Sequence, residues 1–272
     1  MSFETQGKKT LFVCTGNAGK LAEFRACFGT DVEVVGIRDL EARAGVAYVE
    51  PAEDADDFLL NAWTKVVAAT GFVETCAKTL GVSTAALAHA VLVDDSGLCV
   101  PSLGFAPGVH SATYGGLPRD DAKNRKALQD ALRGAGRQEA EAHFVCYLLW
   151  VPVHSELPQG DVFLRALSER EHEGLRPHAV RAALERVPCG GIFEPLAGVP
   201  GGGIAFGYCT GTVRTEEQQL LPGAGHGYDA MFFPLNNPLL SFASVTMEEK
   251  NVVSHRAQAL RALSGALPKA LC

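Results

Sequence analysis

The chain has 272 residues, of which 47% are hydrophobic and 20% charged, and its formal net charge is -7. This composition is typical of a globular protein with a sizeable core, and the acidic balance argues against a surface that binds nucleic acid. No uninterrupted apolar stretch approaches the roughly 18 residues of a membrane span, and the N-terminus lacks the apolar core of a secretory signal. We therefore expect a cytoplasmic protein with neither a membrane nor a nucleic-acid partner. The 8 cysteines contain no CxxC pair, which favours reduced thiols.

The first predicted elements are a buried strand at residues 11–13 and a helix whose apolar residues recur at helical spacing from Leu21 onward. A turn of sequence TGNAGK, residues 15–20, joins them. Its glycines let the backbone approach an anion, the first helical turn offers unpaired N–H groups, and Lys20 adds a positive charge. The turn is not a Walker A loop, because Leu21 stands where Ser or Thr would bind magnesium. A phosphate-binding turn and an ordinary tight turn with a solvated lysine both remain open.

Strand-like and helix-like segments then alternate, which favours an α/β sheet. We predict strands at residues 32–37, 90–93, 143–153 and 204–213, and helices at 56–70 and 117–132. Residues 155–203 change character, with a charge run and several prolines, and we expect them to form an insertion on the scaffold. Thr246 and Glu249 make a capping box that predicts one helix from 246 to about 263.

Two adjacent carboxylates, Asp94 and Asp95, end the predicted strand at 90–93. Hard oxygen ligands of this kind suit Mg²⁺, although a solvated acidic turn or a helix N-cap would have the same sequence. A further acidic group precedes a predicted helix that contains Lys65. Most of that group is explained by the helix dipole, while one member would suit a metal. Its members are Glu50, Glu53, Asp54, Asp56 and Asp57.

Two further motifs lie near the C-terminus. Alternating glycines at residues 223–227 precede Tyr228 and Asp229, which would suit a pocket for a flat ligand or a glycine-rich loop with a core tyrosine. The predicted C-terminal helix carries Lys250, His255 and Arg256. Long side chains at a helix end can converge on one pocket, and His255 and Arg256 would equally suit an exposed pair.

The four motifs, in this order, closely resemble those of the inosine triphosphate pyrophosphatase family, also called Ham1-like proteins. The matching stretches are TGNAGK with Glu23-Phe24, DDSGL at 94–98 with APGVHSATYGG at 106–116, GHGYDAMF at 225–232, and FASVTMEEKNVVSHRAQAL at 242–260. The resemblance covers residues 10–132 and 204–263. It implies a single domain over residues 1–272, with a central mixed sheet flanked by helices and two lobes around an active-site cleft. It also implies a homodimer.

The resemblance further implies Mg²⁺-dependent hydrolysis of ITP, dITP and XTP to the monophosphate and pyrophosphate, with Mn²⁺ as a substitute metal. Asp95, Asp94 and Lys20 would be catalytic, with Asp95 activating the attacking water, and Glu53 and Asp95 would hold the metal. The implied substrate contacts are Thr15, Gly16, Asn17, Ala18, Gly19, Lys20, Lys65, Ser96, His226, Gly227, Tyr228, Asp229, Lys250, His255 and Arg256.

Three residues depart from the family pattern. Leu60 replaces the usual Glu near the metal ligands, His226 replaces Phe, and Ala230 replaces Pro. These changes leave two alternatives: a related house-cleaning nucleoside triphosphate pyrophosphatase with another base preference, and a non-catalytic nucleotide-binding protein.

Overall fold

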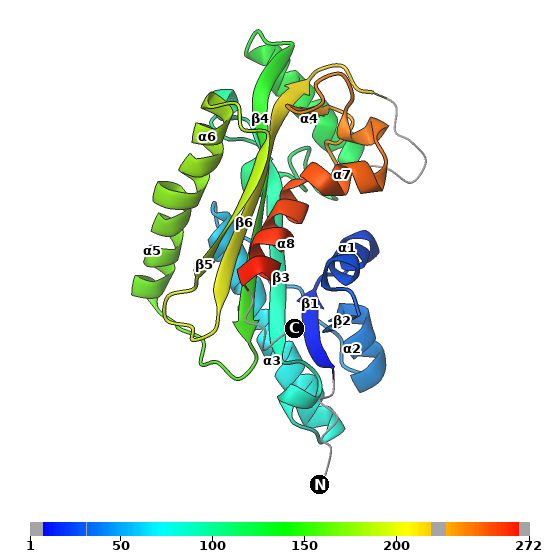
Figure 1. The fold of residues 1–272 in the computed structure, drawn as a ribbon, viewed down its shortest axis with the longest axis vertical. Helices are drawn as coiled ribbons and strands as arrows, with labels where there is room; N and C mark the ends of the chain where they lie inside the picture. Colours follow the sequence, from blue (N-terminus) through cyan, green and yellow to red (C-terminus); the bar gives the residue numbers. More distant parts are fainter. Residues whose placement is uncertain (1–7, 31, 219–226, 267–272) are drawn as a thin grey trace.

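The computed structural model describes residues 8–30, 32–218 and 227–266 (Figure 1). Its centre is a seven-stranded sheet in the order β2-β1-β3-β4-β6-β5, with β7 paired to β6. The strands β1 with β2 and β1 with β3 are parallel, and all other pairs are antiparallel. The strands are β1 (Lys9–Cys14), β2 (Val32–Gly36), β3 (Ala90–Cys99), β4 (Glu139–Pro152), β5 (Cys189–Pro195), β6 (Gly203–Arg214) and β7 (Phe232–Pro234).

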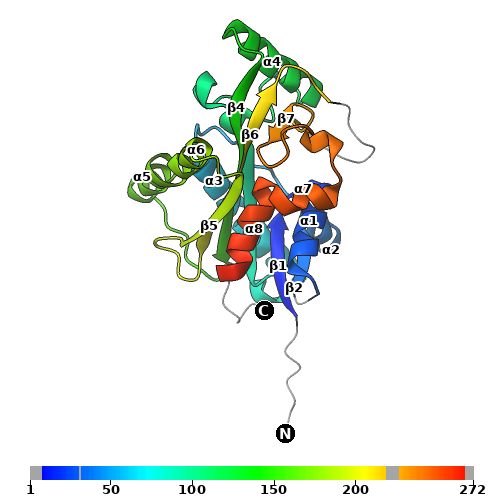
Figure 2. The same ribbon diagram turned by 45° about the horizontal axis from the view of Figure 1, so that its top comes forward.

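Helices cover both faces of the sheet (Figures 1 and 2). They are α1 (Ala18–Phe28), α2 (Ile37–Ala44), α3 (Phe58–Leu80), α4 (Asp121–Gly134), α5 (Asp161–Glu169), α6 (Arg176–Leu184), α7 (Met247–Val253) and α8 (His255–Ala266). A π-helical segment, Arg170–Leu175, joins α5 to α6, and short 3₁₀ turns lie at Thr84–Ala86, Pro101–Leu103, Gly108–His110 and Phe242–Ser244. The predicted α/β fold with a mixed sheet flanked by helices is confirmed.

Side-chain alternation along the strands divides the core into two layers. Phe12 of β1 packs in the layer under α3, α5 and α6, whereas its neighbours Leu11 and Val13 pack in the layer under α1 and α8. Successive strand residues point to opposite faces, and both faces are covered, so the strand reads as a continuous apolar run. A third cluster joins the far ends of β4 and β6 to α4, β7 and the segment before α7. This cluster is the core of the second lobe, at the top of Figure 1.

The strand predicted at 90–93 is longer than expected. β3 continues to Cys99 and pairs with β4 along its whole length, so Asp94 and Asp95 lie inside the strand and not in a turn after it. The expectation of a strand-end turn is wrong because β4 pairs with β3 antiparallel over ten residues and supplies hydrogen bonds past the acidic pair. As neighbours in a strand, the two carboxylates point to opposite faces.

The predicted helix boundaries also move. The helix expected at 56–70 begins at Phe58 and runs on to Leu80, and α4 begins only at Asp121, where the Asp120 side chain accepts hydrogen bonds from the N–H groups of Ala122 and Lys123. The strand expected at 32–37 ends at Gly36, where α2 begins. Side-chain caps mark the first residue of these helices more sharply than the spacing of apolar residues does.

The single helix predicted at 246–263 is two helices. The capping box is present, since Thr246 accepts from Glu249 N–H and Glu249 accepts from Thr246 N–H. However, α7 ends at Val253, and Ser254 has extended dihedral angles before α8 begins. The resulting bend changes the direction of the chain between Lys250 and His255.

The segment 155–203 contributes two helices and one strand. β5 pairs with β6 and extends the main sheet, while α5 and α6 pack against the face that carries α3. In Figures 1 and 2 these helices lie on the other side of the sheet from α8. The segment is therefore part of the packed core rather than an appendage.

Candidate active site

A cavity of about 630 Å³ lies where β1 ends beside β3. The last pair between these strands joins Cys14 to Val93, and among the described residues β3 then has no strand partner on that side until Cys99 bridges to Pro107. The open edge of β3 exposes Asp94, Asp95 and Ser96 to the space that the departing chain leaves. A cleft beyond the carboxyl end of a parallel strand is the usual ligand position in α/β sheets.

The structure brings together nearly all the predicted site residues. Those that line the cavity are Thr15, Gly16, Asn17, Gly19, Lys20, Glu53, Lys65, Asp94, Asp95, Ser96, Gly227, Tyr228, Asp229, Lys250, His255 and Arg256. Ala18 does not line it, because it lies on the exposed side of the first turn of α1. His226 lies outside the described residues.

Asp94 is the centre of an ion-pair network on the α1 and α8 face. Its Oδ1 lies 2.6 Å from Lys20 Nζ, and its Oδ2 lies 2.7 Å from Arg256 Nε. Arg256 also pairs with Glu23 at 2.9 Å, and Ser96 Oγ donates to Asp94 Oδ1 at 3.1 Å. Burial raises the pKa of Asp94, but the two cations outweigh it and hold that pKa well below its ordinary value. Asp94 is therefore a buried, ionised anchor for two basic side chains.

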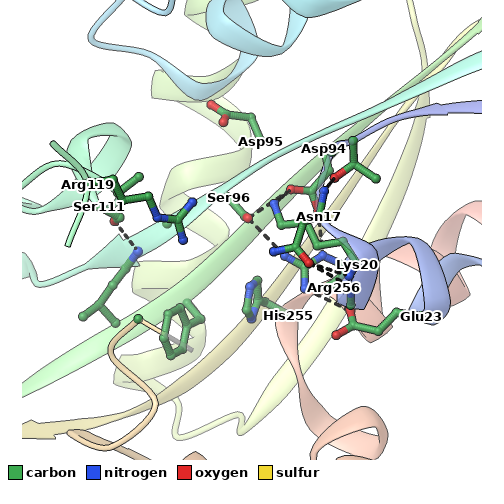
Figure 3. Close-up of a pocket in the computed structure, with 18 of the residues that line it drawn as sticks. Asn17, Lys20, Glu23, Asp94, Asp95, Ser96, Ser111, Arg119, His255 and Arg256 are labelled. Carbon is green, nitrogen blue, oxygen red and sulfur yellow. Dashed lines mark hydrogen bonds and ion pairs between the residues drawn. The ribbon is translucent and has the colours of Figure 1, made fainter. Parts of the chain in front are cut away.

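Asp95 has the opposite character on the other face of β3, as Figure 3 shows. Its Oδ1 accepts from Lys65 Nζ at 2.9 Å, and the same nitrogen lies 2.6 Å from Glu53 Oε2. Its Oδ2 is buried and, among the residues that the structure describes, has no hydrogen-bond partner. Burial raises the pKa of Asp95 to about 6, against the lowering effect of Lys65. A carboxylate with a free oxygen and a pKa near neutrality suits a general base.

The turn at 15–20 forms the N-cap of α1. Asn17 Oδ1 accepts from the N–H groups of Gly19 at 2.9 Å and Lys20 at 3.1 Å, and Thr15 Oγ1 accepts from Asn17 N–H at 3.2 Å. We expected unpaired N–H groups here, and for these two amides the expectation is wrong because the cap satisfies them. The positive end of the helix dipole and the Lys20 charge remain to attract a phosphate.

The other end of the cavity is lined by aromatic and paired polar groups. Lys250 Nζ lies 2.6 Å from Asp229 Oδ2, and the His255 ring stacks on Phe144 with centroids 4.9 Å apart. Burial, assisted by Arg256 and Lys250, holds the pKa of His255 well below its ordinary value, so the imidazole is neutral at pH 7. Its Nδ1 is buried without a partner. The bend at Ser254 lets Lys250 and Arg256 reach one cavity from two helices.

Several lining residues were not singled out from the sequence. They are Tyr48, Ser111, Arg119, Asp121 and Phe144. Glu23 was quoted only as part of a motif, although its position three residues after Lys20 on α1 places both on one face. The others give no signal in the sequence, because their roles depend on which distant segment they meet.

The described lining has an excess of acid, with seven carboxylates against five basic side chains. Four of the basic groups, Lys20, Lys65, Lys250 and Arg256, lie within 2.9 Å of a carboxylate oxygen. A polyanion such as a triphosphate would be repelled by this cavity unless a cation accompanied it.

Glu53 and Asp95 suit such a cation. Both carboxylates converge on a single point, now held by the Lys65 ammonium, and Asp95 Oδ2 is left without a partner. Across the described residues, no cluster of three or more His, Cys, Asp or Glu side chains forms a metal site. That donor set agrees with the habit of Mg²⁺, which takes one or two carboxylates and completes its shell with water and phosphate oxygens.

Paired acids and bases around a cleft at the end of a parallel strand define a class of enzyme that acts on a phosphorylated ligand. The profile of the Ham1 family matches residues 11–170 and 196–266, and the chain belongs to that family. The resemblance read from the sequence motifs is thereby confirmed. The stretch between the two matches, 171–195, lies inside the segment that we predict to be an insertion.

Relatives of similar length support this assignment. A protein of Geobacillus kaustophilus named dITP/XTP pyrophosphatase is 31% identical over 94% of this chain and 92% of its own. One of Chromobacterium violaceum with the same name is 32% identical over 94% of this chain and 96% of its own.

Solved structures agree on the fold. A HAM1 protein of Coxiella burnetii has a TM-score of 0.63 at 23% identity, covering 95% of this chain and 98% of its own. A structure from Mycobacterium abscessus titled nucleoside-triphosphatase / dITP/XTP pyrophosphatase has a TM-score of 0.56 at 26% identity, covering 95% and 99%. Within the described residues, no helix is long and apolar enough to cross a membrane.

Proposed function

We propose that this protein hydrolyses ITP, dITP and XTP between the α and β phosphorus atoms, releasing the nucleoside monophosphate and pyrophosphate and so cleansing the nucleotide pool. The observation that carries the proposal is Asp95, whose buried and unpartnered Oδ2 lies in the cavity beside Glu53 and Lys65. Family membership and the names of the relatives support the substrate class.

We infer that Mg²⁺, or Mn²⁺ in its place, is held by Glu53 and Asp95. Bound there, the cation neutralises phosphate charge and makes a coordinated water more acidic. Lys65 keeps the two carboxylates together when the cation is absent, because one ammonium bridges them.

The chain's own residues perform the remaining steps. Asp95 orients the attacking water and takes its proton. Lys20 and Arg256, positioned by Asp94, withdraw charge from the phosphates as the bond to the leaving pyrophosphate breaks. Ser96 and the turn at 15–20 bind the same end of the substrate.

The base end recognises a 6-keto purine by its hydrogen-bonding edge. Such a base presents an acceptor at position 6 and a donor at N1, whereas adenine presents the reverse. Tyr228, Asp229 and Lys250 line that end of the cavity and supply donors and acceptors in fixed positions. A site whose donors and acceptors match the 6-keto edge rejects ATP, because adenine presents the reverse pattern.

Pyrophosphate release with ITP, XTP, dITP, GTP, ATP and dUTP, each with and without Mg²⁺, tests the proposal. We expect fast, metal-dependent release from ITP, dITP and XTP. A preference for another nucleotide would indicate a house-cleaning pyrophosphatase with a different base pocket. Nucleotide binding without any release would contradict the enzymatic proposal and favour a binding protein.

Replacing Asp95 separates chemistry from binding. In the Asp95→Asn variant we expect kcat to fall by roughly 10²- to 10⁴-fold, because a positioned base is lost. Asp54→Asn is the matched control, since Asp54 is an exposed carboxylate of the same acidic segment and does not line the cavity. Near-normal turnover by Asp95→Asn would rule out Asp95 as the base.

The homodimer, the cytoplasmic location and the absence of nucleic-acid binding stay predictions. Size-exclusion chromatography with light scattering measures the first directly, and a mass of one chain would contradict it.

A further inference from the structure

A single helix face holds both backbone polar groups of one residue beside the cavity, Gly227. Asp121 Oδ2 accepts from Gly227 N–H at 2.8 Å, and Arg125 Nη1 donates to the Gly227 carbonyl oxygen at 3.0 Å. The two side chains are four residues apart on α4, so they stand one turn above each other on the same face. Together they satisfy both backbone polar groups of a residue about a hundred positions away.

The same helix face holds two neighbouring parts of the cavity wall. Arg125 Nε also donates to Glu217 at 3.0 Å, so α4 binds the chain on each side of residues 219–226. Asn124, which is buried, accepts from Gly115 N–H at 2.7 Å and donates to the Ala112 carbonyl at 2.8 Å. The Arg125 side chain is only 16% exposed, which limits competition from water.

Gly227 directly precedes the two residues that line the base end of the cavity. Its φ of +58° is a left-handed conformation that favours glycine, so the backbone of Gly227 sets the direction in which the chain enters Tyr228. Tyr228 Oη then donates to the Ser111 carbonyl at 3.0 Å, and Asp229 pairs with Lys250 at 2.6 Å. A change in the backbone dihedral angles of Gly227 would move the side chains of Tyr228 and Asp229 relative to the wall at 111–115.

We propose that Asp121 and Arg125 clamp the backbone of Gly227 and thereby set base selection, as positioning residues that act through Tyr228 and Asp229. The inference rests on the proposed function, because it assigns the base of the nucleotide to this end of the cavity. Within the described residues, the hydrogen bonds and ion pairs of Asp121 and Arg125 do not involve Asp95, Glu53 or Lys65. It therefore governs binding of the base and the choice between bases more than the rate of the chemical step.

The test compares kcat and KM for ITP and ATP in Asp121→Ala and Arg125→Ala. Each variant loses a hydrogen bond to the backbone of the same residue, and we expect KM for ITP to rise about fivefold while kcat stays within about twofold. The ITP-to-ATP ratio of kcat/KM falls by a similar factor. Because both side chains hold the backbone of Gly227, the double variant shows less than the product of the two single effects.

Two matched variants distinguish a clamp from a general loss of structure. Asp121→Asn keeps an oxygen that accepts from Gly227 N–H, so it retains the wild-type KM. Lys126→Ala removes an exposed α4 side chain that pairs with Asp130, and it should also retain the wild-type KM. Equal loss in Asp121→Asn and Asp121→Ala would overturn the clamp and assign the effect to the charge that faces Arg119, 3.6 Å away. An unchanged selectivity ratio, or an equal fall of kcat for both nucleotides, would also overturn it.

Calorimetric titration with inosine monophosphate gives a readout that needs no turnover. We expect Asp121→Ala and Arg125→Ala to weaken its Kd about fivefold, with wild-type affinity in Asp121→Asn. A wild-type protein that binds this ligand but hydrolyses no triphosphate would contradict the proposed function and leave the clamp supported. Unchanged affinity in both alanine variants would contradict the clamp alone.

Discussion

Asp94 and Asp95 are neighbours in sequence, yet the strand gives them different chemistry. Asp94 meets Lys20 and Arg256 on one face of β3 and is held ionised. Asp95 pairs with Lys65 on the other face. Its second oxygen has no partner among the described residues, and its pKa is raised. The alternation of strand side chains thus separates an anchoring acid from a reactive one without any insertion between them.

Asp94→Asn should destabilise the protein more than it alters the reacting groups. Arg256 is only 12% exposed, so it would remain buried without its main counter-charge, and we expect a loss of about 3–5 kcal/mol in the free energy of unfolding. Urea denaturation measures this loss. Asp130→Asn, which breaks an exposed pair with Lys126, should leave the midpoint unchanged. A midpoint for Asp94→Asn equal to that of the control would show that the network contributes no stability.

At the level of residues, the sequence indicated most of the site but not its connections. Lys20 was found beside the glycines of its turn, Asp95 after the apolar run at 90–93, and Arg256 on the helix that the capping box predicts. The pairing of Arg256 with Glu23, and of Asp121 with Gly227, leaves no such pattern. A hydrogen bond to a distant backbone group can be made by many residue types, so it is visible only in the folded chain.

At Gly207, the strand β6 and the helix α8 approach each other more closely than a residue with a Cβ would allow. A Cβ at Gly207 of β6 would lie 2.2 Å from the His255 carbonyl oxygen and 2.3 Å from Ala259 N. Backbone atoms cannot give way as a flexible side chain does. The close contact places the first turn of α8, and with it Arg256, directly over the sheet beside Asp94.

Gly207→Ala should therefore push α8 off the sheet. We expect a loss of about 1–3 kcal/mol or more from overpacking, together with a rise in KM, because Arg256 moves with the helix. Gly265→Ala in α8 is the control. A Cβ at Gly265 meets no described atom within 4 Å, and the change should raise the free energy of unfolding by about 0.4–1 kcal/mol. Thermal denaturation and kinetics of both variants check the pair. Equal stability of the two would contradict the close packing.

The pattern of elements shows where sequence-based reasoning ends. The apolar runs of β1, β4 and β6 are strong enough to predict strands, and the capping box predicts the start of α7 correctly. The break at Ser254 has no glycine or proline to mark it, although α8 packs closely against β6 just beyond it. The strand β5 was missed because its sequence CGGIFEP lacks a regular alternation and is half-exposed.

Across the whole molecule, one buried acid joins the segment 155–203 to the helix that carries Lys65. Glu171 Oε2 accepts from Leu59 N–H at 2.9 Å in the first turn of α3, next to the N-cap Asp57, and its other oxygen contacts Arg176. Ser168 and His172 bind Asp57 from the same segment. Burial, followed by the neighbouring Asp57, raises the pKa of Glu171 to about 8 despite Arg176.

The raised pKa of Glu171 predicts that the stability of the protein depends on pH. A folded-state pKa above the unfolded value of 4.5 means that the folded form keeps a proton, so the contribution of Glu171 is complete below pH 4.5 and is lost as pH rises towards 8. Between pH 5 and 8, wild-type protein should lose more free energy of unfolding than Glu171→Gln, which carries no titrating group there. His172 is present in both proteins and cancels. A wild type that gains stability over this range relative to the variant would show Glu171 ionised against Arg176.

The acid excess of the cavity has a consequence for the end of each catalytic cycle. Cleavage turns one bound polyanion into two, and the monophosphate and pyrophosphate repel each other as well as the surrounding carboxylates. Like charge therefore drives both products outward. The acidic wall thereby favours product release, and turnover need not wait for a large opening of the two lobes.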